Sequence, residues 1–214
     1  MHPSPCHIIL PPAYLPPVAY YVAKSYASNA DVDYDMPFNK RAKEVHRCTI
    51  TDANGIIRLT IPIEKPQSAT QALWSDIIIS GHNRWWEIHL TALKSAYGRT
   101  PFFEYYLDDF LPFYNADVVG EPLVDYLRRM DRMLTRLLGV DTVRRIRFVE
   151  PDSTGTFPLV DLRRQPIATE RSMPYYQQRT AGRTFVGGLS AVDLLFNLGP
   201  ESPLILAATP SQFQ

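Results

Sequence analysis

Cysteine is scarce in this chain, with only Cys6 and Cys48 among 214 residues. Neither residue has the CxxC or Cys/His spacing of a zinc site, and two cysteines are too few for a disulfide framework in a chain of this length. The first residues also lack the basic flank and apolar run of a signal peptide. We therefore expect a cytoplasmic protein in a reducing compartment.

Long hydrophobic runs and an excess of charge are missing as well. No segment approaches the roughly 18 consecutive apolar residues that a membrane span requires. Lys plus Arg and Asp plus Glu are equal at 22 each, so no overall electric field attracts nucleic acid or an anionic membrane. We expect neither a nucleic-acid partner nor a membrane span, and the sequence indicates no oligomeric state.

The common catalytic motifs do not occur. The chain has no P-loop, GxGxxG, GxSxG or HExxH motif and no paired CxxC, which excludes the most frequent nucleotide, hydrolase and zinc signatures. His82 and His89 are too far apart along the chain for a metal-binding pattern. No cofactor and no metal is indicated.

The chain is nevertheless rich enough in apolar residues for a sizeable core, at 45% hydrophobic. We expect a single domain over residues 1–214. The apolar run His7 to Leu10 predicts a strand, Pro16-Pro17 predicts a helix start, and residues 30–35 alternate like a second strand. This order predicts a β-α-β unit.

A β-hairpin is the clearest element after that unit. Arg47 to Thr51 and Ile56 to Ile63 flank a turn that contains Asn54-Gly55. Asn-Gly favours a type I′ turn, whose twist matches that of the strands. The apolar residues 77–79 predict a further strand.

Helical periodicity dominates the middle of the chain. Residues 83–96 and 102–114 have helical spacing, and a leucine stripe after Pro122 predicts a third helix. The aromatic and acidic run 102–110 suits either a platform for a sugar or an aromatic core helix. The prolines of residues 150–188 predict an irregular or edge-strand segment. We therefore expect an α/β fold in which a mixed sheet, opening with the β-α-β unit and the hairpin, packs against several helices.

The segment Leu189 to Glu201 reads as a short helix with both ends specified. Ser190 is a suitable N-cap, and Asp193 stands where an acidic residue closes a capping box. Gly199-Pro200 stops the helix. Asn197, near the exit of this helix, remains a candidate for ligand binding.

Candidate binding residues cluster near the first helix and the hairpin. Tyr14 and Tyr20 flank the first strand-to-helix turn, where open α/β folds usually bind ligands, although both side chains also suit simple packing of helix on sheet. Oppositely charged residues crowd the loop before the hairpin, which predicts either a site for an anionic or sugar-like ligand or a solvated connection. The candidates in this loop are Asp35, Lys40, His46 and Arg47.

His89 is the leading candidate for acid-base chemistry, because a histidine changes charge near neutral pH. It follows Trp85 by one helical turn and borders an apolar stripe. The alternative is a hydrogen-bonded core histidine. His46 is the second catalytic candidate.

Several segments together resemble the WbqC-like protein family: Ala13 to Pro17, Ser95 to Tyr97, Thr100 to Tyr106, Leu138 to Thr142 and Leu189 to Glu201. Members are often encoded beside genes for bacterial surface polysaccharides such as O-antigen or capsule. The resemblance implies a transferase or accessory enzyme that acts on a nucleotide-activated sugar or amino sugar. His89 or His46 would serve as acid or base, Lys40 and Arg47 would hold phosphate, and Tyr14 and Trp85 would shape the sugar site.

The sequence departs from the family pattern before the helix and before the hairpin. Many members have Gln where this chain has Pro11, and an Asn-Arg pair where it has His46-Arg47. Longer relatives also carry an additional segment before the closing motif. These departures favour an alternative function, a non-catalytic binding or assembly protein of a biosynthetic complex.

Overall fold

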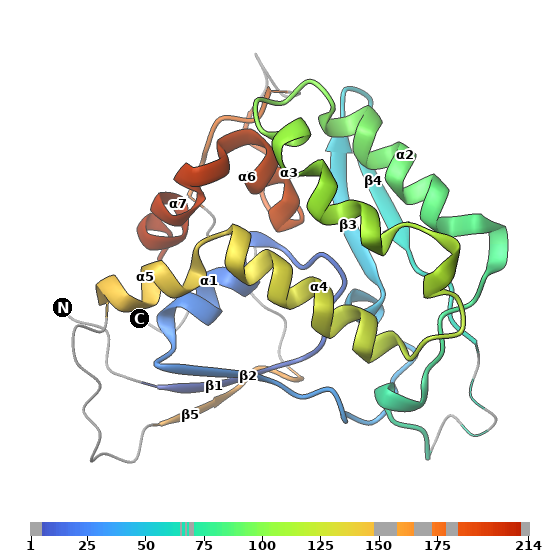
Figure 1. Cartoon of the computed structure of the whole chain (residues 1–214). Helices are drawn as coiled ribbons and strands as arrows, with labels where there is room; N and C mark the ends of the chain where they lie inside the picture. The colour runs from blue at the N-terminus through green and yellow to red at the C-terminus, as the bar shows by residue number, and fades with distance from the viewer. Residues whose placement is uncertain are drawn as a thin grey trace.

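The computed structural model describes residues 6–64, 66, 68, 71–147, 158–164, 173–178 and 184–210. A small parallel sheet lies along the lower side of the helices, and a separate antiparallel hairpin lies among them (Figure 1). The described elements share one hydrophobic core. This mixed arrangement confirms the α/β fold expected from the sequence.

The parallel sheet has three strands in the order β2-β1-β5. Strand β1 (His7–Leu10) pairs with β2 (Asn29–Val32) on one side and with β5 (Leu159–Asp161) on the other. Helix α1 (Val18–Tyr26) connects β1 to β2, which confirms the predicted β-α-β unit. Strand β5 lies in the segment 150–188, which was expected to be irregular or to form an edge strand. At residues 159–161 it is an edge strand.

Strand β2 ends earlier than predicted because the Asp33 side chain turns the chain. Its Oδ1 accepts a hydrogen bond from the Asp35 backbone N–H at 3.1 Å. Side chains that bond the backbone two residues ahead favour a turn over an extended strand.

The hairpin consists of β3 (Arg47–Asp52) and β4 (Gly55–Thr60), as predicted apart from an earlier end of the second strand. The predicted turn type was wrong. Because Asp52 pairs with Gly55, the central residues of the turn are Ala53 and Asn54. Neither has a positive φ, whereas a type I′ turn requires a positive φ at both of its central residues. The Asp52 carboxylate closes the turn by accepting from the N–H groups of Asn54 and Gly55, at 2.7 Å and 3.1 Å.

Residues 77–79 do not form the predicted strand. Ile78 and Ile79 instead make isolated bridges, to Pro122 and Ile63 respectively. These bridges bring the connection after the hairpin against the start of helix α4 (Leu123–Leu137).

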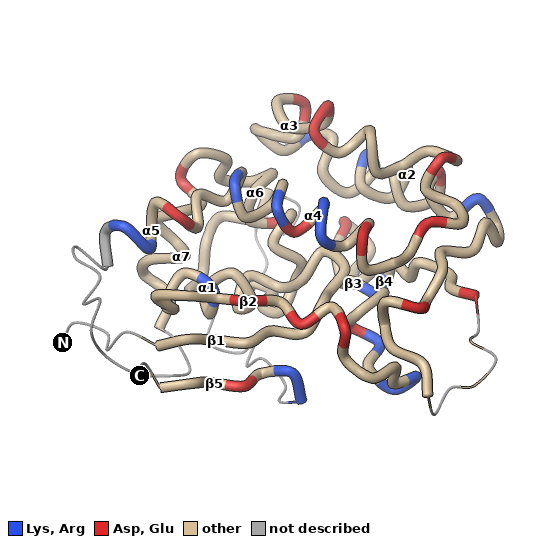
Figure 2. Tube along the Cα trace, turned by 60° about the horizontal axis from the view of Figure 1, so that its bottom comes forward, with Lys and Arg blue, Asp and Glu red and all other residues tan. Residues whose placement is uncertain are grey.

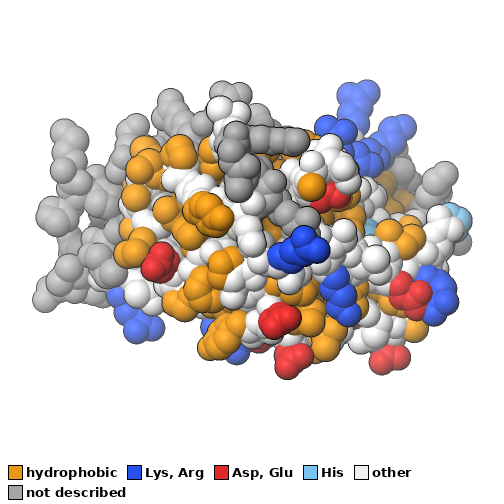
Figure 3. All heavy atoms as spheres, turned by 90° about the horizontal axis from the view of Figure 1, so that it is seen from above, with side chains coloured by type: hydrophobic (Ala, Val, Ile, Leu, Met, Phe, Trp, Pro, Cys, Tyr) orange, Lys and Arg blue, Asp and Glu red, His pale blue; other side chains and the backbone are white. Residues whose placement is uncertain are grey.

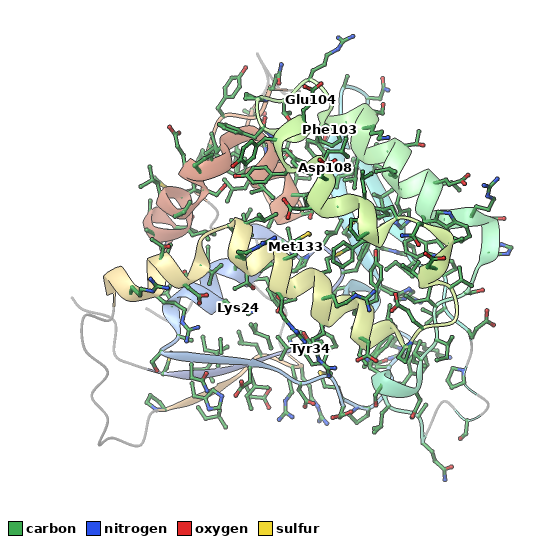
Figure 4. The ribbon with its side chains drawn as sticks, in the orientation of Figure 1. Lys24, Tyr34, Phe103, Glu104, Asp108 and Met133 are labelled. Atoms are coloured by element: carbon green, nitrogen blue, oxygen red, sulfur yellow. The ribbon has the colours of Figure 1, made fainter. Side chains whose placement is uncertain are left out.

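Helices α2 (Trp85–Tyr97), α3 (Phe103–Phe110) and α4 confirm the predicted helical segments. In α3 the rings of Phe103 and Phe110 pack against Phe196, while Glu104 and Asp108 are exposed (Figure 4). The run 102–110 is therefore an aromatic core helix. Helix α5 (Val140–Arg147) follows α4 directly.

The chain closes with α6 (Ala191–Leu198) and α7 (Ser202–Ala208). Ser190 is the N-cap of α6, as predicted, and its hydroxyl accepts from the Val192 N–H. Asp193 does not close a capping box, because its carboxylate bonds Tyr175 and Gln177 instead.

Gly199 ends α6 in a conformation that suits glycine alone. Its φ is +50°, and a Cβ at this position would lie 2.5 Å from the Phe102 ring. The Phe102 ring at the start of α3 therefore leaves no room for a side chain at the end of α6.

Among the described residues, no helix has the length and the apolar character that crossing a membrane requires. Seen from above, one half of the visible face is mainly hydrophobic and the other half carries more charged groups (Figure 3). Large exposed hydrophobic side chains include Tyr105 of α3 and Leu204 of α7, which are 75% and 67% exposed.

Candidate functional site

The Tyr14 hydroxyl joins three distant parts of the chain inside the core. Its oxygen lies 2.9 Å from His89 Nδ1 on α2 and 2.9 Å from the hydroxyl of Tyr114. The His89 ring also hydrogen-bonds the backbone of Thr60 at the end of β4. All three side chains are buried, with exposed fractions of 0% for Tyr14, 3% for His89 and 5% for Tyr114.

Burial lowers the pKa of His89 to about 4, so the ring is neutral at pH 7. A neutral imidazole has one N–H donor and one acceptor. The arrangement that pairs every hydrogen has Tyr14 donating to His89 Nδ1 and accepting from Tyr114. Because burial also raises the pKa of Tyr14 far above its usual value, this buried chain fixes the two rings and does not favour transfer of the phenolic proton.

Trp85 encloses the histidine from the first turn of α2. Its ring meets His89 edge to face at 5.0 Å and Tyr126 of α4 at 6.0 Å. Among the described residues, its buried Nε1 has no hydrogen-bond partner. Trp85 therefore shapes the wall of the histidine site.

Strained backbone flanks both sides of this cluster. Among the described residues other than glycine, a positive φ occurs at Leu15, Asn83 and Arg84, with values of 41°, 58° and 46°. The first follows Tyr14 and the last precedes Trp85. Such conformations cost roughly 1–3 kcal/mol each and are concentrated at functional sites, because surrounding contacts must hold them in place.

His46 has a different environment from His89. Its Nδ1 donates to the Ile61 carbonyl at 2.9 Å, and within the described ranges no partner binds its Nε2. Burial lowers the pKa of His46, and the nearby charges of Lys43 and Arg47 lower it further. The ring is therefore neutral at pH 7 and keeps one nitrogen lone pair available.

Three predicted residues meet at the end of β4. His46 bonds the Ile61 carbonyl, His89 bonds the Thr60 backbone, and Arg47 Nε donates to Thr60 Oγ1 at 2.8 Å. Tyr14 is adjacent, since its N–H donates to the carbonyl of Glu44 in the 3₁₀ turn η1 (Lys43–Val45). We call this group the β4-end cluster; its members are Tyr14, His46, Arg47, Trp85 and His89.

The other predicted site residues do not join this cluster by any contact among the described residues. Asp35 and Lys40 are exposed on the loop that leads to His46, where acidic residues come first and basic residues follow (Figure 2). Tyr20 donates to the Pro11 carbonyl at 3.0 Å and thereby ties α1 to the end of β1. Asn197 is buried on α6, where its amide bonds the Asp193 carbonyl and the Gln178 N–H.

The first N–H group of α1 already has a partner within the protein. The Val18 N–H, the first of the helix, donates to the Leu189 carbonyl at 3.4 Å. A helix N-terminus binds anions through its free N–H groups, so the closing segment competes for this position.

A second polar group, between α1 and α4, was missed in the sequence. Lys24 Nζ lies 2.6 Å from Asp131 Oδ2 and 3.0 Å from Thr135 Oγ1, and the two charged side chains are only 10% and 13% exposed. Figure 4 shows Lys24 and Tyr34 on the same side of α4, and the Arg128 guanidinium lies 4.5 Å above the Tyr34 ring. In the sequence, this ion pair was indicated only by a lysine inside an otherwise apolar helix. The partner of Lys24 could not be identified from local spacing, because it lies 107 residues away.

The described residues contain no group of three or more His, Cys, Asp or Glu side chains placed to hold a metal ion. Cys48 is buried near the tyrosines of the core, and burial raises the pKa of its thiol well above the usual range. A thiol held in this protonated form is a poor nucleophile.

A comparison with protein families supplies a match. The model of the WbqC-like protein family matches residues 12–155, more than half of the 214 residues. The matched range contains every member of the β4-end cluster. No curated protein and no solved structure matches the chain.

Proposed function

Because this chain belongs to the WbqC-like protein family, we propose that it acts on an activated sugar or amino sugar in the biosynthesis of a bacterial surface polysaccharide. The proposed catalytic residue is His46. The observation that carries this assignment is its hydrogen bonding: one ring nitrogen is fixed by the Ile61 carbonyl, and the other has no partner among the described residues.

A histidine held in this way suits general base catalysis. The bond from Nδ1 to a backbone carbonyl fixes the tautomer, so that Nε2 carries the lone pair. The lowered pKa of His46 keeps that lone pair unprotonated at pH 7. Nε2 would accept the proton of the acceptor's hydroxyl or amino group as that group bonds to the activated carbon of the sugar, the bond from this carbon to phosphate breaks and the nucleotide leaves.

Positive charge beside His46 supports binding of the phosphate groups of the donor. Arg47 uses Nε for Thr60, which leaves its two terminal nitrogens available in the described part of the chain. A guanidinium pairs with phosphate through two parallel hydrogen bonds. Lys40, on the same loop, would add a second positive charge.

His89 has a positioning role in this proposal. Its ring is bonded by Tyr14 and by the Thr60 backbone, so it holds the residue that Arg47 also binds. Loss of His89 would disturb the end of β4 without removing the proposed base.

The binding step is tested by thermal unfolding with a panel of nucleoside-diphosphate sugars. A ligand present at about 100 times its Kd stabilises the folded state by about 2.7 kcal/mol. We expect at least one of these sugars to raise the Tm of the wild type and Arg47→Gln to lose most of the shift. Arg58→Gln is the matched control, because Arg58 is an exposed arginine on the same hairpin, in the strand that ends at Thr60.

The proposal is wrong if no nucleotide sugar changes the Tm, or if Arg58→Gln reduces the shift as much as Arg47→Gln. The catalytic step is tested separately, by the release of the nucleotide from a sugar that binds. His46→Gln is expected to retain binding and to lose this release, whereas His89→Gln keeps a measurable rate.

A second candidate function, a non-catalytic binding or assembly protein, is favoured by the closed His89–Tyr14–Tyr114 chain. That chain is fully hydrogen-bonded and buried, as in a structural core. Binding of a nucleotide sugar with no release of nucleotide, in the wild type and in His46→Gln alike, would support this function over the catalytic one.

A further inference from the structure

Residues 173–178, which we call the strap, are bonded to one face of α6. The Tyr175 hydroxyl and the Gln177 amide both donate to Asp193 Oδ2, at 2.7 Å and 2.8 Å. The backbone N–H of Gln178 donates to Asn197 Oδ1 at 2.9 Å. Because Asp193 and Asn197 are four residues apart, their side chains lie on the same face of the helix.

Gln177 also fastens the strap to the segment that precedes α6. Its side-chain amide donates to the Val186 carbonyl and accepts from the Val186 N–H, both at 3.0 Å. The Gln177 amide thus satisfies both backbone groups of Val186, as the backbone of a paired strand would. The Tyr175 ring meets Phe185 edge to face at 5.1 Å, so the strap and this segment contact each other at two positions.

Hydrophobic contacts contribute little to holding the strap. Met173 and Tyr176 are 42% and 58% exposed. Tyr175 is the strap residue that packs, partly buried, against the hydrophobic core. A segment with few buried apolar contacts opens more readily than the core it covers.

The strap covers a carboxylate for which burial is unfavourable. Asp193 is 1% exposed. The groups that face it are Tyr97 from α2 and Tyr175 and Gln177 from the strap, and no ion pair to it is found in the described ranges. The hydrogen bonds of neutral donors offset only part of the cost of removing a carboxylate from water. Opening of the strap would return Asp193 to solvent.

We propose that the strap is a latch, which opens as one unit while the rest of the chain stays folded and thereby exposes the polar groups of Asp193, Asn197 and Tyr97. The contacts explain why it would move as a unit. Gln177 bonds α6 and Val186 at the same time, so release of one contact weakens the other. The latch is independent of the catalytic role of His46.

The latch has a defined dependence on pH. Burial raises the pKa of Asp193 in the closed form, whereas the open form has the usual carboxyl pKa. Closure is therefore strongest below the usual carboxyl range, where Asp193 is protonated in both forms, and weakens as pH rises through the raised pKa. The two facing tyrosines, Tyr97 and Tyr175, have raised pKa values and remain neutral throughout this range.

Hydrogen exchange of the full chain tests the proposal. The reporters are the amides of Gln178 and Val186, whose acceptors are side chains of Asn197 and Gln177. After correction for intrinsic rates, we expect both amides to exchange at least about tenfold faster than the amides inside α6, and at similar rates to each other. Tyr175→Phe is expected to speed both reporters about tenfold and to leave α6 unchanged.

Tyr176→Phe is the matched control, because Tyr176 is an exposed tyrosine of the same strap with no hydrogen bond among the described residues. It should leave both reporters unchanged. Asp193→Asn should remove the pH dependence of opening, since it removes the titrating group. The proposal is overturned if the reporters are as protected as α6, or if Tyr175→Phe and Tyr176→Phe have the same effect.

Discussion

Stability in weak acid should depend on His89. The folded protein holds the pKa of His89 near 4, against an ordinary value of 6.5. A histidine whose pKa is lowered by folding binds its proton first in the unfolded chain, so it contributes stability above pH 6.5 and loses it as pH falls toward 4. Because a tenfold difference in proton affinity between the folded and unfolded chains corresponds to about 1.4 kcal/mol, the full loss is about 3 kcal/mol.

Urea unfolding between about pH 7.5 and pH 4.5 measures this loss, with the buried tryptophans Trp74, Trp85 and Trp86 as fluorescent reporters. The comparison is His89→Gln, whose amide can accept from Tyr14 and donate to Thr60 without titrating. The wild type should lose about 2 to 3 kcal/mol more than the variant over this range.

The difference between the two proteins isolates His89 from other titrating groups. His46 also has a lowered pKa and contributes in the same direction, while Asp193, with a raised pKa, contributes in the opposite direction. Both are present in the wild type and in the variant. Equal pH slopes in the two proteins would refute the conclusion that His89 is buried in its neutral form.

Further predictions concern the ion pair, the end of α6 and the buried thiol. Lys24→Met leaves the carboxylate of Asp131 buried without a cation and should cost about 3 kcal/mol of unfolding free energy in urea titrations, with part of the loss recovered when Asp131 is also replaced by Leu. Gly199→Ala forces a Cβ into the Phe102 ring at a φ of +50° and should lower stability by about 2 kcal/mol, measured by thermal unfolding. Cys48 should resist alkylation in the native protein and react after denaturation, as read by mass spectrometry.

Local sequence patterns predicted the elements that local interactions determine. The strand His7–Leu10, the helix after Pro17 and the hairpin follow from apolar spacing, proline and turn residues. The turn type was missed because the Asp52 carboxylate, and not the Asn-Gly pair, determines the backbone of the turn. A side chain that accepts from the backbone can override the preference of the residues that follow it.

Local sequence patterns could not predict the contacts between segments that are distant in the chain. The spacing of Ser190 and Asp193 suggested a capping box, yet tertiary hydrogen bonds from Tyr175 and Gln177 draw the carboxylate away. In the same way, the role of Lys24 became visible only with its partner on α4. The convergence of His46 and His89 on the end of β4 also depends on tertiary folding, although each residue was individually predicted.

The position of β1 in the middle of the parallel sheet has a consequence for synthesis of the chain. Its second neighbour, β5, lies at residues 159–161, and the α6 and α7 helices that pack beside α1 follow later still. On the ribosome, the β1-α1-β2 unit therefore emerges with one strand edge and much of one helix face without a partner. Pairing across so long a stretch of chain is slow. Deletion of the C-terminal helices should therefore produce aggregation, even though the family match ends before them.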